Sequence, residues 1–143
     1  MKSLISKTLL LCTMAISLFS FTAKPGGEGF EIFVDNKLMI QRFGHDINTV
    51  QSLQLNQQSG NEKLLIKYHH CGRVGKNRVI AIKDAQNVVL KEFRYSDPAT
   101  ASSAMSLEIK DILGLKKKGT GLLKLFYTSS ELPGGRLLTT INP

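Results

Sequence analysis

The fold class is decided by residues 63–95, KLLIKYHHCGRVGKNRVIAIKDAQNVVLKEFRY. Three short apolar runs follow one another in this stretch, at 64–68, 79–82 and 88–95. In the first run Leu64, Ile66 and Tyr68 fall on one face of an extended segment, because successive side chains of a strand point to opposite faces. The segments between the runs contain Gly, Asn and Asp, which favour chain reversal. The stretch therefore predicts a meander of three consecutive strands.

Further short apolar runs lie on both sides of this stretch, at 30–34, 38–40, 53–55, 122–128 and 136–141. The turn 35–37 predicts that the first two of these runs form a hairpin. The segment 105–110 alternates between apolar and polar residues and is expected to be a strand. The spacing of Ile109, Ile112 and Leu113 also fits one side of a helical turn.

The pattern as a whole predicts an all-β domain of about eight strands, because no segment before Ser103 keeps a helical period for three turns. Ser96–Ser103 is rich in Ser, Ala, Thr and Pro, which is typical of a crossover between the meander and the last three strands. This organisation favours a two-layer antiparallel β-sandwich with immunoglobulin-like or jelly-roll-like topology.

The first 23 residues have the layout of a cleaved secretory signal peptide. Lys2 and Lys7 form a short positive region, and residues 8–23 carry no charge and include the apolar core of the segment. A membrane-spanning helix needs about 20 predominantly apolar residues, and Ser and Thr dilute this stretch. We therefore expect cleavage near Ala23, no transmembrane anchor in the mature chain, and an exported single domain over 24–143, periplasmic or extracellular.

The mature chain is expected to be basic and to keep one cysteine. Of 19 Lys and Arg in the chain, Lys2 and Lys7 are lost on cleavage, which leaves 17 against 11 acidic residues and a net charge of +6. A positive charge of this size favours encounters with anionic partners. Cleavage also removes Cys12, so Cys71 has no partner for an internal disulfide and is expected to be buried as a small apolar side chain.

The triplet His69-His70-Cys71 is the densest group of metal-ligating residue types in the chain. On a strand, His69 and Cys71 project from one face and His70 from the other, so the three cannot act as one ligand set. His69 and Cys71 together with His45 or Asp46 could bind zinc or copper.

The competing interpretation gives the triplet a structural role. In that case Cys71 is interior, His70 shares the face of Tyr68, and His69 is solvent-facing or hydrogen-bonded. We favour this interpretation, because two ligands fixed by sequence are a weak signal for a metal site.

Catalysis is not expected. The nucleophile-elbow pattern Gly-x-Ser-x-Gly is absent from the sequence. Cys71 could act as a nucleophile with a histidine base, but Gly72 opens a loop rather than a helix that would lower the pKa of the thiol. The acidic residues are scattered singly, whereas glycosidases need two converging carboxyl groups. The sequence therefore predicts a non-enzyme, and no cofactor is implied.

Positive charge is concentrated in two segments, which supply six cations: Arg73, Lys76, Arg78, Lys116, Lys117 and Lys118. If both segments lie at one end of the sandwich, these side chains form a patch for an anionic polymer or surface. If they are separate, they are solvated turns whose charges keep strand ends soluble.

Aromatic platforms for sugars are not evident, since the chain has no Trp and most aromatic residues lie in apolar runs. Phe33 and Tyr127 are the exceptions, because each is expected to point away from its more apolar neighbours. Such side chains either close a second layer or are exposed.

The sequence thus predicts a small exported binding or interaction module without catalytic activity. The alternative is an accessory protein with a metal or thiol site centred on His69 and Cys71. A third interpretation is a structural or assembly role, in which an unpaired edge strand receives a strand from another protein.

Overall fold

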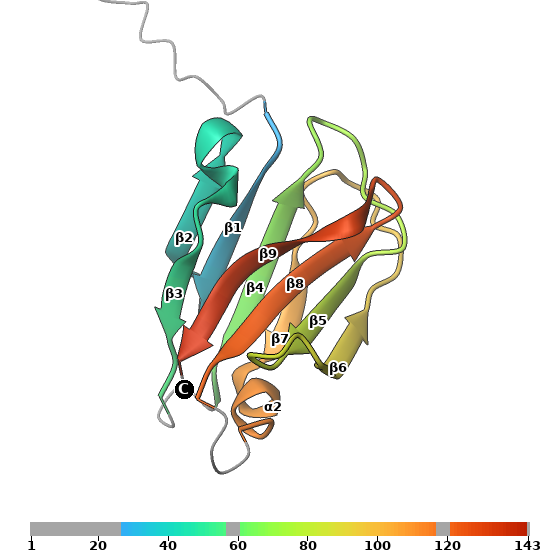
Figure 1. Ribbon diagram of the computed structural model, residues 1–143. Helices are drawn as coiled ribbons and strands as arrows, with labels where there is room; N and C mark the ends of the chain where they lie inside the picture. Colours follow the sequence, from blue (N-terminus) through green and yellow to red (C-terminus); the bar gives the residue numbers. More distant parts are fainter. Residues whose placement is uncertain (1–26, 57–60, 117–120, 143) are drawn as a thin grey trace, which may run out of the picture.

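The computed structural model describes residues 27–56, 61–116 and 121–142, which form two β-sheets and two short helical segments (Figure 1). The expected signal peptide, residues 1–23, lies outside the described residues. None of the helices in the described ranges is long and apolar enough to cross a membrane. The strands are β1 (Gly29–Val34), β2 (Lys37–Phe43), β3 (Gln51–Gln54), β4 (Lys63–His69), β5 (Val79–Lys83), β6 (Val89–Arg94), β7 (Met105–Glu108), β8 (Leu123–Ser129) and β9 (Leu132–Asn142).

The first sheet has the strand order β2-β1-β4-β7, and the second sheet has the order β3-β9-β8-β5-β6. The all-β prediction is confirmed, with nine strands in the described ranges where about eight were expected. Every pair of neighbouring strands is antiparallel except β3 and β9, which run parallel with Gln51 beside Thr139. The prediction of purely antiparallel sheets is therefore wrong at one edge of the second sheet.

The predicted three-stranded meander is wrong at its first connection. β4 pairs with β1 and β7 in the first sheet, whereas β5 pairs with β8 and β6 in the second. The segment after β4 therefore crosses from one sheet to the other (Figure 1). The hairpins β1–β2 and β5–β6 and the crossover from β6 to β7 over Ser96–Ser103 agree with the sequence.

The segment after the crossover combines both structures that its sequence allows. Met105–Glu108 forms the edge strand β7, and Ile109–Leu113 forms the short helix α2. A strand over 105–110 is therefore wrong from Ile109 onwards. The helix begins there because Ile109 and Ile112, spaced by three residues, both become fully buried on one side of the turn.

The core lies between the two sheets and receives side chains from both. Ile32 and Ile66 from the first sheet and Ile80 and Leu125 from the second are completely buried. The sheets thus lie over one another with their apolar faces turned inward (Figure 1). Tyr127 belongs to this core and is not exposed.

Aromatic rings on the outer faces are covered by lysine side chains. The ammonium of Lys67 lies 5.2 Å from the ring centroid of Phe33, and that of Lys83 lies 4.0 Å from the ring centroid of Phe126. The aliphatic stem of a lysine shields a ring while its charge stays in water. Phe33 is therefore partly covered by its own sheet.

Candidate functional site

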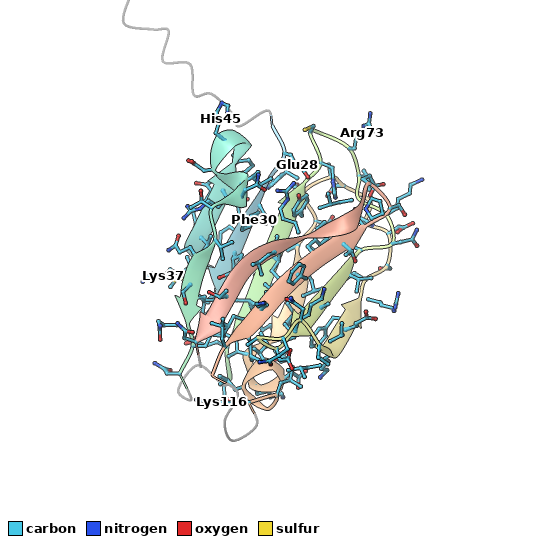
Figure 2. The ribbon with its side chains drawn as sticks, in the orientation of Figure 1. Glu28, Phe30, Lys37, His45, Arg73 and Lys116 are labelled. Carbon is cyan, nitrogen blue, oxygen red and sulfur yellow. The ribbon has the colours of Figure 1, made fainter. Side chains whose placement is uncertain are left out.

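The described residues of the two basic segments lie at opposite ends of the molecule. Figure 2 shows Arg73 beyond the end of β4 and Lys116 near α2, at the other end of the strands. Lys117 and Lys118 fall outside the described residues. Among the described cations, Arg73 and Lys116 therefore do not share one patch, and the exposed cations of the loop after β4 are Arg73 and Lys76.

Arg78, the third cation of that loop in the sequence, is an interior residue with 7% of its surface exposed. Its guanidinium donates hydrogen bonds to the carbonyl oxygens of Ser103, at 2.8 Å, and Ser96, at 3.3 Å. Arg78 thus anchors the crossover between the sheets. The expectation that Arg78 is exposed is wrong, because its guanidinium is buried against backbone carbonyls.

The three candidate metal ligands, His45, His69 and Cys71, lie in different surroundings. His69 Nε2 lies 3.1 Å from Glu31 Oε2, and its ring packs at 5.3 Å from the ring of Phe43. His45 is exposed on the 3-10 helix η2 (Gly44–Asn48). The described ranges contain no group of three or more His, Cys, Asp or Glu that could hold a metal ion. His69 is hydrogen-bonded, as the structural interpretation expects.

Cys71 is exposed, so the prediction that its thiol is buried is wrong. The alternation of β4 ends at His70, because Cys71 has a φ of 53° and the chain turns back with Arg73 N donating to the carbonyl of His70 at 3.0 Å. This turn takes Cys71 out of the strand and removes the common face that sequence spacing assigned to it and His69.

An open pocket of about 340 Å³ lies at this end of the molecule. It is lined by residues from the segment preceding β1, from the loop after β4 and from the turn between β8 and β9: Glu28, His70, Cys71, Arg73, Glu131 and Leu132. The lining combines two carboxylates, one guanidinium, a thiol, an imidazole and an apolar side chain. The pocket therefore presents both signs of charge beside apolar surface.

One wall of the pocket is held by a polar cluster around Glu28. The hydroxyl of Tyr68 donates to Glu28 Oε1 at 2.5 Å, and Arg136 Nε donates to the Tyr68 oxygen at 2.8 Å. Arg136 also pairs with Glu28 Oε2 at 3.3 Å. Burial, together with the neighbouring carboxylate, raises the pKa of Tyr68, so its hydroxyl stays protonated as a donor.

His70 forms the floor of the same pocket and is 7% exposed. Its Nε2 lies 2.9 Å from the hydroxyl of Tyr127 and 3.3 Å from Ser129 Oγ. The centroid of its ring lies 4.7 Å from the ring centroid of Tyr68, which confirms that these two side chains share one face of β4. Burial lowers the pKa of His70, and the neutral imidazole is therefore the stable form at neutral pH.

The loop after β4 is fastened to the turn after β8 by several hydrogen bonds. Lys76 N donates to Glu131 Oε2 at 2.9 Å, and Ser130 N donates to the carbonyl of Lys76 at 2.8 Å. Asn77 Nδ2 donates to Ser130 Oγ at 2.8 Å. Gly75 packs against the His70 ring. A Cβ on Gly75 would lie only 2.9 Å from Tyr127 Oη. Loop and turn thus form one joined surface.

Several residues of this site were not identified in the sequence: Glu28, Glu131, Leu132 and Arg136. Their signal is weak, because Glu28 is far along the chain from the other three and no local pattern links these residues. The shared face of Tyr68 and His70 was the one local clue. No model of a protein family matches the chain, and no curated protein matches it significantly, so the site is interpreted from its own residues.

Proposed function

We propose that this chain is an exported, non-catalytic binding module that binds a protein partner at the end where the loop after β4 meets the β8–β9 turn. The observation that carries the proposal is the open pocket there, which is built from three chain segments and backed by a hydrogen-bonded aromatic cluster. Binding sites on rigid scaffolds are commonly built from such loops.

The strand order supports an immunoglobulin-like sandwich. In that fold the strands A, B and E lie in one sheet and G, F, C and C′ in the other. The orders β1-β4-β7 and β9-β8-β5-β6 match this arrangement, with β2 and β3 as additional edge strands. The loop after β4 then corresponds to the B–C loop and the β8–β9 turn to the F–G loop, two of the loops that bind antigen in variable domains. This correspondence is an analogy of fold.

Export is proposed from the sequence of residues 1–23, with its two lysines and uncharged apolar segment. A binding role without catalysis is supported by the state of His70. Its Nε2 is occupied by the hydroxyls of Tyr127 and Ser129. The imidazole therefore acts as part of the scaffold rather than as a free base.

A protein partner fits the pocket better than an anionic polymer does. Arg73 lies among the carboxylates of Glu28 and Glu131, which repel polyanions, and Leu132 adds apolar surface. Protein interfaces combine such apolar and charged groups of both signs. An anionic polymer favours a continuous positive surface, and Arg73 and Lys116 are at opposite ends of the molecule.

The proposal is tested by site-specific photocrosslinking from Cys71, in a protein whose Cys12 is replaced by serine. A benzophenone attached to Cys71 is expected to form a discrete adduct with one protein when the labelled chain is added to cells of the source organism. The matched control carries Cys71→Ser and Gln86→Cys, which moves the label to the turn after β5, at the other end of that strand. Equal adducts from both positions, or none from Cys71, would contradict the proposal.

A second measurement separates the two partner classes. Retention on immobilised heparin is expected to be weak and equal for the wild type and for the double variant Arg73→Ala, Lys76→Ala. Strong retention that falls steeply with salt and is lost in this variant would replace the protein partner by an anionic polymer.

A further inference from the structure

We infer that His70 is an acid-sensitive latch, in which protonation of the imidazole releases the loop after β4 from the β8–β9 turn and opens the pocket between them. The regulatory meaning of the latch rests on the proposed binding role of this pocket. The opening itself is a property of the isolated chain and is measured without a partner.

Burial favours the neutral imidazole, with Nε2 as its acceptor nitrogen. Burial raises the pKa of Tyr127, so its phenol keeps its proton and can donate it to Nε2 over 2.9 Å. Ser129 Oγ lies 3.3 Å from Nε2, accepts a hydrogen bond from Leu132 N at 3.2 Å and also hydrogen-bonds to Glu131 and Tyr127. The single lone pair of Nε2 thus accepts the Tyr127 proton, with the Ser129 hydroxyl beside it. A proton on Nε2 turns that acceptor into a donor facing the Tyr127 hydroxyl, which then has to reorient inside the protein.

Charged or titratable groups from four segments of the chain act on the ring. Two carboxylates favour the imidazolium: Glu131 from the β8–β9 turn and Glu28 from the segment before β1. Two groups oppose it: Arg78 from the start of β5 and His69 on β4. Arg73 lines the same pocket and adds a further positive charge. Burial also disfavours the imidazolium and is the largest influence, so the pKa of His70 is lowered.

His70 is placed to transmit its protonation to the loop. Its carbonyl accepts the hydrogen bond from Arg73 N that forms the turn after β4. Its ring lies directly under Gly75, where a Cβ would be 3.0 Å from Nε2. A ring that moves to solvate its charge displaces Gly75. The adjacent Lys76 is displaced with it. This movement strains the bond from Lys76 N to the Glu131 carboxylate and the bond from Ser130 N to the Lys76 carbonyl.

The direction of the pH effect follows from the lowered pKa. Above pH 6.5, the ordinary pKa of histidine, the latched and open forms are both neutral and the latch is fully stable. Below that value the open form takes up a proton that the latched form resists, and the balance shifts toward opening. At pH 5.0, which is 1.5 pH units below the ordinary pKa of histidine, the population of the open form rises by up to about 30-fold.

Amide hydrogen exchange of the whole protein, compared at pH 7.5 and 5.0 after correction for intrinsic exchange rates, tests the latch. We expect the amides of Arg73, Lys76 and Ser130 to lose at least fivefold in protection at pH 5.0, while the strand amides of β5 and β8 keep theirs. In His70→Gln, whose side chain does not titrate, the protection of these three amides is expected to be independent of pH. His69→Gln is the matched control and is expected to retain the wild-type pH dependence.

The latch is overturned if wild type and His70→Gln show the same pH dependence, or if His69→Gln abolishes it. A measurement on the wild type alone covers the case in which His70→Gln does not fold. The imidazole resonance of His70 in NMR is expected to titrate below pH 6.5, and the loop amides are expected to shift with the same midpoint. A midpoint at or above 6.5, or loop amides that follow another group, contradicts the latch. None of these outcomes depends on the photocrosslinking result, so the latch and the binding role fail separately.

Discussion

The guanidinium of Arg78 is buried at the start of β5, where it supports the crossover that brings the chain back to the first sheet. It donates to two backbone carbonyls on either side of that crossover, and its Nε has no hydrogen-bond partner in the described part of the chain. A charged donor to a backbone carbonyl contributes more than a neutral one. Arg78 thus carries a desolvation cost that its two hydrogen bonds have to offset.

Replacing Arg78 by methionine is expected to destabilise the protein by about 2 kcal/mol, because the aliphatic packing is retained while two charged hydrogen bonds are lost. The measurement is the urea midpoint of unfolding. Arg94→Met on the edge strand β6 is the matched control, since Arg94 pairs with Glu92 at the surface, and less than about 1 kcal/mol is expected there. Equal effects at the two positions would show that Arg78 does not anchor the crossover.

Single residues of the site were predictable only where a local pattern controls them. The common face of Tyr68 and His70 follows from strand alternation and is confirmed by their ring contact. Cys71 was placed wrongly because its left-handed backbone conformation ends that alternation, and an ordinary residue in this conformation has no strong sequence signal. The pairing of Glu28 with Arg136 joins positions far apart in the chain, and no local pattern reports such a contact.

At the scale of elements, strand positions were predictable and strand partners were not. Leu64 and Ile66 alternate into the core as expected. The loop from Gly72 to Asn77 has a length and composition that also suit a hairpin, so the sequence favoured pairing of β4 with β5. The pairing of β4 with β1 and β7 is instead set by contacts over the whole sheet, with Ile66 beside Ile32 and Met105.

The parallel edge strand β3 depends on a buried hydroxyl. Thr139 on β9 is completely buried, and its Oγ1 donates to the carbonyl of Gln51 at 2.6 Å. The strand is only four residues long, and the bond from Leu55 N to the carbonyl of Asn142 lies just beyond its end. β3 therefore relies on few contacts to stay on the sheet.

Thr139→Val is expected to cost about 1 kcal/mol, because valine keeps the volume and removes the hydrogen bond. Hydrogen exchange should localise the effect, with faster exchange of Leu53 and Leu55 and unchanged exchange in the first sheet. Thr140→Val, on the neighbouring and partly exposed position, serves as the control and is expected to change stability by less than about 0.5 kcal/mol. Unchanged exchange of Leu53 and Leu55 in Thr139→Val would rule out this role of the hydroxyl.

At the scale of the whole molecule, the three tyrosines of the chain share one property. Burial is the main cause that raises the pKa of Tyr68, Tyr95 and Tyr127, and the pKa of Tyr95 reaches about 12. The tyrosines of the unfolded chain ionise near pH 10. The native protein therefore holds protons that the unfolded chain releases, and this contribution to stability is full below pH 10 and is lost as the pH rises toward 12.

Absorbance at 295 nm, which follows phenolate formation, is expected to show no ionisation of the native protein near pH 10. At higher pH all three tyrosines should ionise together with unfolding, followed in parallel by circular dichroism. A step near pH 10 with one third of the total amplitude, while the circular dichroism stays native, would show that one of the three rings is accessible to solvent.

The parallel pairing of β3 with β9 also determines when the second sheet can be completed. Gln51–Gln54 lies in the first half of the chain and finds its partner only at Thr139–Asn142, within the last residues of the sequence. Pairings over such separations close large loops, which slows folding to the millisecond-to-second range typical of β-sandwiches. During synthesis β3 stays without its neighbour until the final strand emerges. In the export that we propose, β3 therefore stays unpaired until almost the whole domain has crossed the membrane.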